Sequence, residues 1–140
     1  MLVVVCILCN LSISVNAITS DIHVGAGASA FSSESIIPTN SNYIQMHLAM
    51  TYVKFVYYPA GCIPSSYYVY VRFYAFPSST SPISDAWPIG NSNIAFSQPS
   101  TFGYNYYLDN SNGGFGQCIR LRTNSDSNLS FEVIYEWDEV

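Results

Sequence analysis

Apolar side chains recur at every second position along much of this 140-residue sequence, and that spacing restricts the fold more than any other feature. Successive side chains of a β-strand point to opposite faces, so the spacing predicts half-buried strands. No stretch keeps the 3.6-residue apolar period of a helix. The run at residues 67–76 alternates most clearly, with Val69, Val71, Phe73 and Ala75 on one face and Tyr68, Tyr70, Arg72 and Tyr74 on the other. The pattern therefore predicts an all-β fold.

The alternation changes phase near Thr51. Before this residue the apolar positions are Ile44, Met46, Leu48 and Met50, and after it they are Val53, Phe55 and Tyr57. Alternation cannot change face without an extra residue or a reversal of the chain. The sequence therefore predicts a β-bulge or a tight turn at Thr51.

The second half of the chain supplies further strands around a long polar connection. Residues 78–100 are rich in Ser, Pro and Asn and predict a loop with at most one short strand, near residues 94–96. Residues 102–108 alternate again, and the last two segments predict a hairpin around residues 124–128. In its register Leu121 faces Phe131, Ile119 faces Val133, and Arg120 faces Glu132.

Seven or eight short antiparallel strands with long polar connections predict a two-sheet sandwich or jelly roll. A closed barrel is the alternative architecture. The phase change and the Ser/Pro-rich connection favour the sandwich, because they suit strands that pass from one sheet to the other.

The amino-terminal segment has the layout of a signal peptide. Residues 2–8 are an unbroken apolar run, a more polar stretch follows, and Val15-Asn16-Ala17 places small residues before a cleavage point after Ala17. A retained membrane anchor is the alternative, but Asn10 and Asn16 interrupt the apolar run. We therefore expect a secreted protein with no membrane span after cleavage. Its expected divisions are a signal peptide at 1–17, an extended segment with a candidate first strand at 18–42, and a β-sandwich domain at 43–140.

Secretion determines how the cysteines and one asparagine are interpreted. Cys6 and Cys9 fall within the signal peptide, which leaves Cys62 and Cys118. Two thiols in one small domain of an oxidising compartment predict a single disulfide. Asn128-Leu129-Ser130 is a glycosylation sequon, so Asn128 is expected to carry a glycan if the source is eukaryotic.

The charge balance disfavours nucleic acid as a partner. Four Lys and Arg residues stand against nine Asp and Glu residues, which gives a net charge of −5, and only 9% of the residues are charged. Four cations dispersed along an acidic sequence do not predict a stripe that follows a phosphate backbone.

Candidate catalytic and metal-binding residues are few. His23, beside Asp21, and His47 are the only side chains with an ordinary pKa suited to a neutral-pH base, and both are more simply interpreted as solvated. The candidate acids Asp85, Asp109, Glu132 and Glu136 fall on loops or on a charged strand face. Asn124, Asp126 and Asn128 alternate like the first ligands of a calcium loop, but the required glycine and closing glutamate are missing. The sequence therefore predicts neither an enzyme nor a metal or other cofactor.

The tyrosine-rich face of residues 67–76 is the strongest candidate binding surface. Tyrosine combines a rigid aromatic body with a polar tip and is common in recognition surfaces, so Tyr68, Tyr70, Arg72 and Tyr74 are the predicted binding residues. Further tyrosines expected near this row are Tyr52, Tyr58, Tyr104, Tyr106 and Tyr107. The competing interpretation is that the row has no binding role and only covers the second sheet or a sheet edge, because aromatic residues favour strands.

Two functions follow from this surface. The first is a secreted recognition module that binds a carbohydrate or a protein partner, and the second is a structural protein that assembles with itself into a coat, fibre or shell. An exposed edge at residues 67–76 would favour assembly through strand pairing. A concave aromatic patch that includes Trp87 or Trp137 would favour ligand binding.

Overall fold

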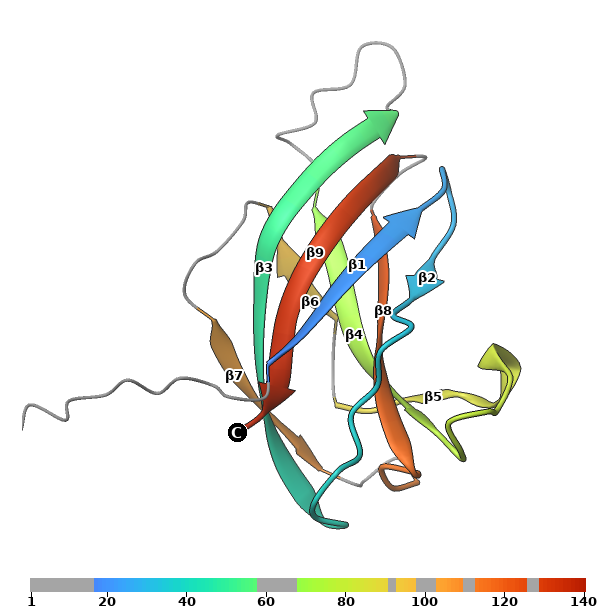
Figure 1. Cartoon of the computed structure of the whole chain (residues 1–140), viewed down its shortest axis with the longest axis vertical. Coiled ribbons are helices and arrows are strands. Elements are labelled where there is room, and N and C mark those ends of the chain that lie inside the picture. The colour runs from blue at the N-terminus through green and yellow to red at the C-terminus, as the bar shows by residue number, and fades with distance from the viewer. Residues whose placement is uncertain (1–16, 58–67, 91–92, 98–102, 110–112, 126–128) are drawn as a thin grey trace, which may run out of the picture.

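The alternating segments form β-strands in the computed structural model, which describes residues 17–57, 68–90, 93–97, 103–109, 113–125 and 129–140 (Figure 1). Within these ranges a short 3-10 helix, η2 (Ile83–Asp85), interrupts the strands. The nine strands are β1 (Ile18–Val24), β2 (Ala30–Phe31), β3 (Tyr43–Tyr57), β4 (Val69–Phe76), β5 (Trp87–Pro88), β6 (Ile94–Phe96), β7 (Tyr104–Asp109), β8 (Cys118–Ser125) and β9 (Ser130–Glu139). The predicted all-β class is confirmed.

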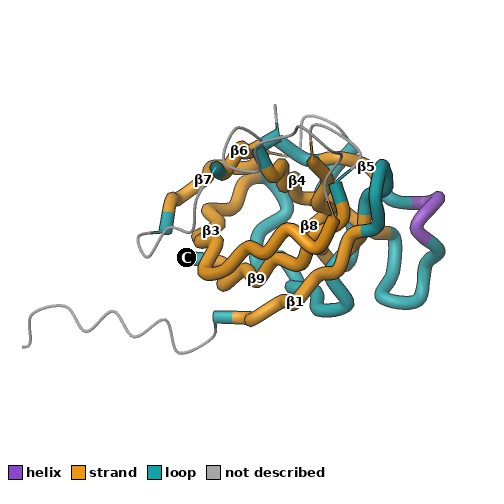
Figure 2. The backbone as a smooth tube through the Cα atoms, turned by 90° about the horizontal axis from the view of Figure 1, so that it is seen from above, coloured by secondary structure: helices purple, strands orange, loops and turns teal. Residues whose placement is uncertain are grey.

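The strands form two antiparallel sheets. Sheet A has the order β1-β9-β3-β7, and sheet B has the order β2-β8-β4-β5, with β6 also paired to β4. Strands β5 and β6 share one edge of β4, because β5 pairs with Tyr74 and Ala75 whereas β6 pairs with residues 69–71. Figure 2 shows the sheets as separate layers, with β1 and β9 along one side and β4, β5 and β6 along the other.

The first half of the chain pairs with the second half in reverse order. Strand β4 pairs with β5 and β6, β3 with β7, β2 with β8, and β1 with β9. Two further pairings, β3 with β9 and β4 with β8, join these nested pairs side by side. The result is one long hairpin that is folded over into two layers.

A single hydrophobic core lies between the sheets. Its largest fully buried side chains come from both layers, with Phe73 from sheet B and Trp137, Tyr135 and Phe131 from sheet A among them. The rings of Phe73 and Trp137 lie 6.3 Å apart, and the hydroxyl oxygens of Thr123 and Tyr135 lie 2.9 Å apart. The two inner faces are therefore in direct contact, in a β-sandwich-like arrangement.

Strand β3 contains the predicted phase change as a bulge. It continues without a turn from Tyr43 to Tyr57, and its register with β9 shifts between Met50 and Tyr52. The inserted Thr51 is exposed, and its hydroxyl donates a hydrogen bond to the Ile134 carbonyl at 3.2 Å. Of the two predicted explanations for the phase change, the bulge is therefore the correct one.

The predicted hairpin between the last two strands is wrong. Strand β8 pairs with β2 and β4 in sheet B, whereas β9 pairs with β1 and β3 in sheet A. Leu121 and Phe131 both face the core from different sheets, and Arg120 lies opposite Tyr74 while Glu132 lies opposite His23 and Lys54. Alternation identified the buried faces of β8 and β9 correctly. It does not determine whether two strands with buried faces are neighbours in one sheet or lie in opposite sheets across the core.

The remaining segments extend the sheets beyond the predicted strands. The expected short strand near residues 94–96 is present as β6, and the same connection also contains η2 and β5. The segment expected to be extended, residues 18–42, supplies β1 to sheet A and β2 to sheet B, so both sheets include residues that precede position 43.

The structure does not contain the predicted disulfide. Cys118 is a buried free cysteine, and Cys62 lies outside the described residues. The chain enters β4 at Val69, whereas Cys118 pairs with Phe76 at the other end of that strand. These ends are about 23 Å apart at 3.3 Å per residue. Cys118 therefore lies at the opposite end of β4 from Val69, where the chain re-enters sheet B after the segment that contains Cys62.

Two other predictions concern residues that the structure does not describe. The apolar run of the expected signal peptide lies within residues 1–16, and Asn128 lies within residues 126–128. Within the described ranges no helix is long and apolar enough to cross a membrane.

Candidate functional site

The four predicted binding residues lie together on the outer surface of sheet B. Along β4 the side chains of Val69, Val71, Phe73 and Ala75 point into the core, so the intervening side chains point outward. Tyr68 is 45% exposed, whereas Tyr70, Arg72 and Tyr74 are half-buried. The row therefore does not belong to the core between the sheets.

Strand β8 adds two arginines beside this row. Its buried positions Ile119, Leu121 and Thr123 leave Arg120 and Arg122 on the outer surface. In the β4–β8 register Arg122 lies opposite Arg72, and Arg120 lies opposite Tyr74. We call Tyr68, Tyr70, Arg72, Tyr74, Arg120 and Arg122 the tyrosine–arginine face.

This face gathers three of the four Lys and Arg residues of the chain. The sequence indicates that the cations are dispersed, because positions 72 and 120 are far apart along the chain. The two-residue spacing of Arg120 and Arg122 within an alternating strand was the signal that they share a face. The pairing of β8 with β4, which brings them to Arg72, was not predicted.

Arg122 and Tyr74 hold one another in place across the two strands. Nη1 of Arg122 donates a hydrogen bond to the Tyr74 hydroxyl at 2.9 Å, and the guanidinium carbon lies 5.5 Å from the centre of that ring. Nε of Arg122 donates to the Ser29 hydroxyl at 3.2 Å. The ring of Phe31 packs edge-on against Tyr74 at 5.2 Å. These contacts restrict both side chains to one orientation.

The other two guanidinium groups donate to backbone carbonyls. Nη2 of Arg72 donates to the Gly90 carbonyl at 2.9 Å, and Nη2 of Arg120 donates to the Ser79 carbonyl at 2.9 Å. The Arg120 guanidinium also lies over the Phe76 ring, 4.8 Å from its centre. Among the described residues none of the three arginines forms an ion pair with a carboxylate.

The aromatic part of the face is smaller than the sequence suggested. The rings of Tyr68 and Tyr70 lie 6.4 Å apart with 37° between their planes. The other tyrosines expected nearby belong to sheet A or are not described: Tyr52 lies on β3, Tyr104, Tyr106 and Tyr107 lie on β7, and Tyr58 is outside the described residues. The tyrosines therefore do not form one continuous surface.

Tyr106 and the two tryptophans pack inward. The ring centres of Tyr106 and Phe73 lie 6.4 Å apart. Burial raises the pKa of Tyr106, and the nearby Tyr104 raises it further. Trp137 is fully buried and donates its indole hydrogen to the Ser20 hydroxyl. Trp87 packs against the core and donates to the Gly114 carbonyl. Neither tryptophan supplies an exposed platform of the kind expected for a concave aromatic patch.

A hollow opens between the edges of the two sheets. It has a volume of about 290 Å³ and is lined by Phe73, Ile89, Gly90, Asn93, Ile94, Tyr106, Tyr107 and Leu108. Gly90 is shared with the face, because its carbonyl accepts the hydrogen bond from Arg72. None of the face's own side chains lines the hollow.

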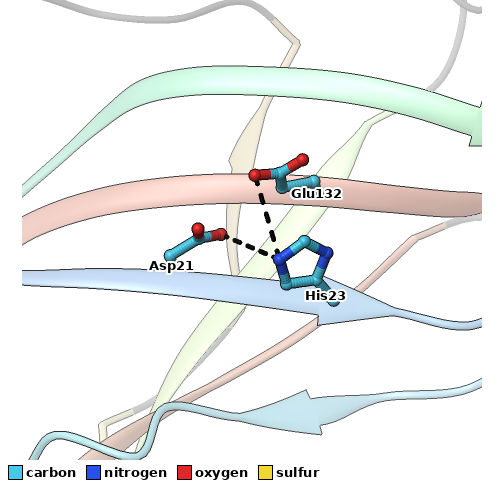
Figure 3. A network of polar contacts seen from close by, with 3 residues as sticks. All are labelled: Asp21, His23 and Glu132. Atoms are coloured by element: carbon cyan, nitrogen blue, oxygen red, sulfur yellow. Dashed lines mark ion pairs between the residues drawn. The ribbon is translucent and has the colours of Figure 1, made fainter.

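The outer surface of sheet A carries a separate polar cluster around His23 (Figure 3). Nε2 of His23 lies 3.4 Å from an Asp21 carboxylate oxygen and 3.8 Å from a Glu132 carboxylate oxygen. The His23 side chain is 69% exposed, so solvent screens these ion pairs strongly. The sequence predicted the Asp21–His23 proximity but not Glu132, which the β1–β9 register places opposite His23.

The cluster offers one imidazole and two carboxylates. One potential ligand atom from each residue lies within 4.8 Å of the others, a donor set of the type that binds divalent transition metals.

The remaining candidate residues are distributed over several elements. Asp85 lies on η2, Asp109 on β7 and Glu136 on β9, while Nδ1 of His47 lies 3.4 Å from an Asp138 carboxylate oxygen.

Comparison of the chain with protein-family models gives no match, and comparison with curated protein sequences gives none either.

Proposed function

We propose that this protein is a secreted, non-enzymatic recognition module with a jelly-roll fold that binds a carbohydrate through the tyrosine–arginine face. The observation that supports this most directly is the outward position of the Tyr68, Tyr70, Arg72 and Tyr74 row beside two further arginines. A row that only filled the core would face the other sheet.

The jelly-roll assignment rests on the nested pairing of the strands. A jelly roll is a double-sheet fold of eight strands with two Greek-key connections. If β5 and β6 count as one interrupted strand, eight strands pair in nested order and divide equally between the sheets. Jelly rolls are widely used by lectin and capsid domains, an analogy of fold that does not determine the ligand.

The chemistry of the face suits a polar ligand with flat apolar patches. Each outward side chain of the face has a planar body and at least one hydrogen-bonding group at its end. The C–H surface of a sugar ring can lie against a tyrosine ring while its hydroxyls accept hydrogen bonds from guanidinium groups. A protein partner would instead favour a dry apolar centre, and the face has no exposed aliphatic side chain.

The frame beneath the face is rigid. Strand β4 is an interior strand, paired with β8 on one side and with β5 and β6 on the other. A binding surface on such a strand loses little conformational freedom when it binds its ligand. The same position argues against assembly by strand pairing at residues 67–76, because β4 has no free edge along its paired length.

Secretion of the module is proposed from the amino-terminal sequence alone. The apolar run and the small residues before position 18 support cleavage after Ala17. Glycosylation of Asn128 is proposed on the same basis, from its sequon.

A glycan-array measurement tests the proposal. The wild-type protein is expected to bind a defined set of glycans, and Tyr70→Ala is expected to weaken that binding at least tenfold. Tyr43→Ala is the matched control, because Tyr43 is 64% exposed but lies on β3 of the other sheet. Absence of glycan binding, or equal losses in the two variants, would contradict carbohydrate recognition by this face.

A second candidate function, self-assembly, is favoured by the separation of charge between the two outer surfaces. Sheet A presents Asp21, Glu132 and Glu136 with one cation, Lys54, whereas sheet B presents three arginines. Opposite surfaces of one molecule that attract each other give head-to-tail contacts that close into rings or grow into filaments. Light scattering over a range of protein concentrations would show assemblies that dissociate as salt is added. A monomer at every concentration would exclude this function.

A further inference from the structure

Two arginines lie directly opposite each other on the outer surface of sheet B. Arg72 of β4 and Arg122 of β8 are register partners, and both side chains point away from the core. Directly opposed side chains on antiparallel strands have Cβ atoms about 4.5–5.5 Å apart, and like charges at such positions are destabilising. This pair therefore places two positive charges together at a cost to the folded protein.

No carboxylate among the described residues offsets this cost. The described hydrogen bonds of Arg72 and Arg122 all go to neutral acceptors, namely the Gly90 carbonyl, the Tyr74 hydroxyl and the Ser29 hydroxyl. The chain as a whole has more than twice as many acidic as basic residues. A site for which the described part of the chain supplies no counter-charge is suited to an anion supplied by a ligand.

The two guanidinium groups are held in place and retain unused donors. A guanidinium has five N–H donors, and the described contacts occupy one donor of Arg72 and two of Arg122. Nε of Arg72 is buried without a partner, so the unused donors of Arg72 that can meet a ligand are on its two Nη atoms. The planar fork of an arginine matches the paired oxygens of a sulfate or carboxylate group. Tyr70 and Tyr74 flank Arg72 along β4, so aromatic rings lie on both sides of this position.

Building on the proposed function, we propose that the carbohydrate bound by the tyrosine–arginine face is anionic. Its sulfate or carboxylate group is held by Arg72 and Arg122, and its sugar rings lie against the flanking tyrosines. Carbohydrate is favoured over an acidic peptide because the neighbouring side chains are aromatic rings with hydroxyl ends, which suit hydroxylated rings rather than an extended backbone.

The test compares one neutral oligosaccharide with its sulfated form. Dextran hexasaccharide and sulfated dextran hexasaccharide are titrated against the wild-type protein by calorimetry at low and at physiological salt. We expect the sulfated form to bind at least tenfold more tightly, with a preference that falls as salt screens the charges. Arg122→Gln and Arg72→Gln are each expected to reduce that preference at least fivefold.

Lys54 provides the matched control. It is the remaining cation of the chain, and it lies on β3 of sheet A opposite Glu132. Lys54→Gln changes the net charge by the same amount as the arginine substitutions and is expected to leave the preference unchanged. Arg122→Lys keeps the charge without the planar fork and is expected to bind the sulfated form with intermediate affinity. Circular dichroism of each variant verifies that it is folded.

The outcomes separate this inference from the proposed function. Equal binding of the two oligosaccharides would overturn the anionic specificity and leave carbohydrate recognition standing. Failure of the wild-type protein to bind either form would count against both proposals. An equal loss of preference in Lys54→Gln would show that net charge alone attracts the ligand, and would overturn the assignment to Arg72 and Arg122. Self-association that neither oligosaccharide displaces would assign the face to a second copy of the chain instead.

Discussion

At Gly116 the backbone has a conformation that other residues adopt only with strain. Its φ is +63°, and a Cβ atom at this position would lie 2.3 Å from the carbonyl oxygen of Phe76. We predict that Gly116→Ala lowers the free energy of unfolding by about 2 kcal/mol or more, since strain and a backbone clash combine. Urea denaturation followed by fluorescence measures the change.

Gly25 provides the control for that substitution. A Cβ atom there has nothing within 4 Å, so Gly25→Ala should change the unfolding free energy by no more than about 0.5 kcal/mol. Similar losses in the two variants would show that the tight approach of Gly116 to Phe76 is not present in solution.

Tyr135 makes the stability of the protein depend on pH in the alkaline range. Burial raises the pKa of Tyr135 well above its ordinary value of 10.0, although the hydrogen bond between Tyr135 and Thr123 opposes that shift. Ionisation is then disfavoured only in the folded state. The contribution to stability is therefore complete below about pH 10 and is lost as the pH rises above that value.

Unfolding of the wild-type protein and of Tyr135→Phe at a series of pH values tests this. Between about pH 10 and pH 11 the wild-type free energy of unfolding should fall more steeply than that of the variant, by up to about 1.4 kcal/mol per pH unit. Parallel curves for the two proteins would mean that Tyr135 ionises in the folded state as an exposed tyrosine does.

At the scale of the element, the bulge of β3 determines which side chains reach the core in both halves of the strand. Met46 and Met50 are fully buried before it, and Val53 and Phe55 pack against the core after it. Deletion of Thr51 would turn one of these halves outward, because strand periodicity is two. We predict that the deletion abolishes cooperative unfolding, as monitored by near-ultraviolet circular dichroism during thermal denaturation.

Substitution of the same residue separates the bulge from the Thr51 side chain. Thr51→Ala keeps the extra residue and loses only the hydrogen bond to the Ile134 carbonyl, so its cost should be about 1 kcal/mol or less. A folded deletion variant with wild-type stability would show that β3 tolerates a change of register.

Some features of the strands could be predicted from the sequence and others could not. The buried and outward faces of β4 and the bulge in β3 follow from local alternation, since each side chain alternates with its own neighbours along one strand. The separation of β8 and β9 into different sheets does not, because two apolar faces satisfy the same pattern whether they lie side by side or across a core. The Arg72–Arg122 pair exists because β8 pairs with β4. The sequence therefore located the outward row of β4 but not the two arginines of β8 that lie beside it.

At the scale of the whole molecule, the two ends of the described chain depend on each other. Strand β1 pairs along its length with β9, adds Ile22 and Val24 to the core, and accepts the indole hydrogen bond of Trp137 through Ser20. Full burial of the Ile22 and Val24 side chains contributes about 1.5–3 kcal/mol each. That sum is a large fraction of the roughly 5–15 kcal/mol that stabilises a typical domain.

We therefore predict that a chain beginning at Gly25 is largely unfolded at 37 °C, whereas one beginning at Ile18 is folded. Binding of a hydrophobic dye and thermal denaturation compare the two proteins. A melting temperature of the shorter chain within a few degrees of the longer one would show that sheet A is stable without β1.

The nested pairing of the strands has a consequence for the synthesis of the protein. Strand β9 lies between β1 and β3, although it is the last strand to leave the ribosome. Strand β1 pairs with β9 alone among the described strands, so it has no partner strand until residues 130–139 have been made, whereas β3 can already pair with β7. We therefore expect sheet A to be completed only after these residues have been synthesised, and until then its apolar side chains are exposed to chaperones.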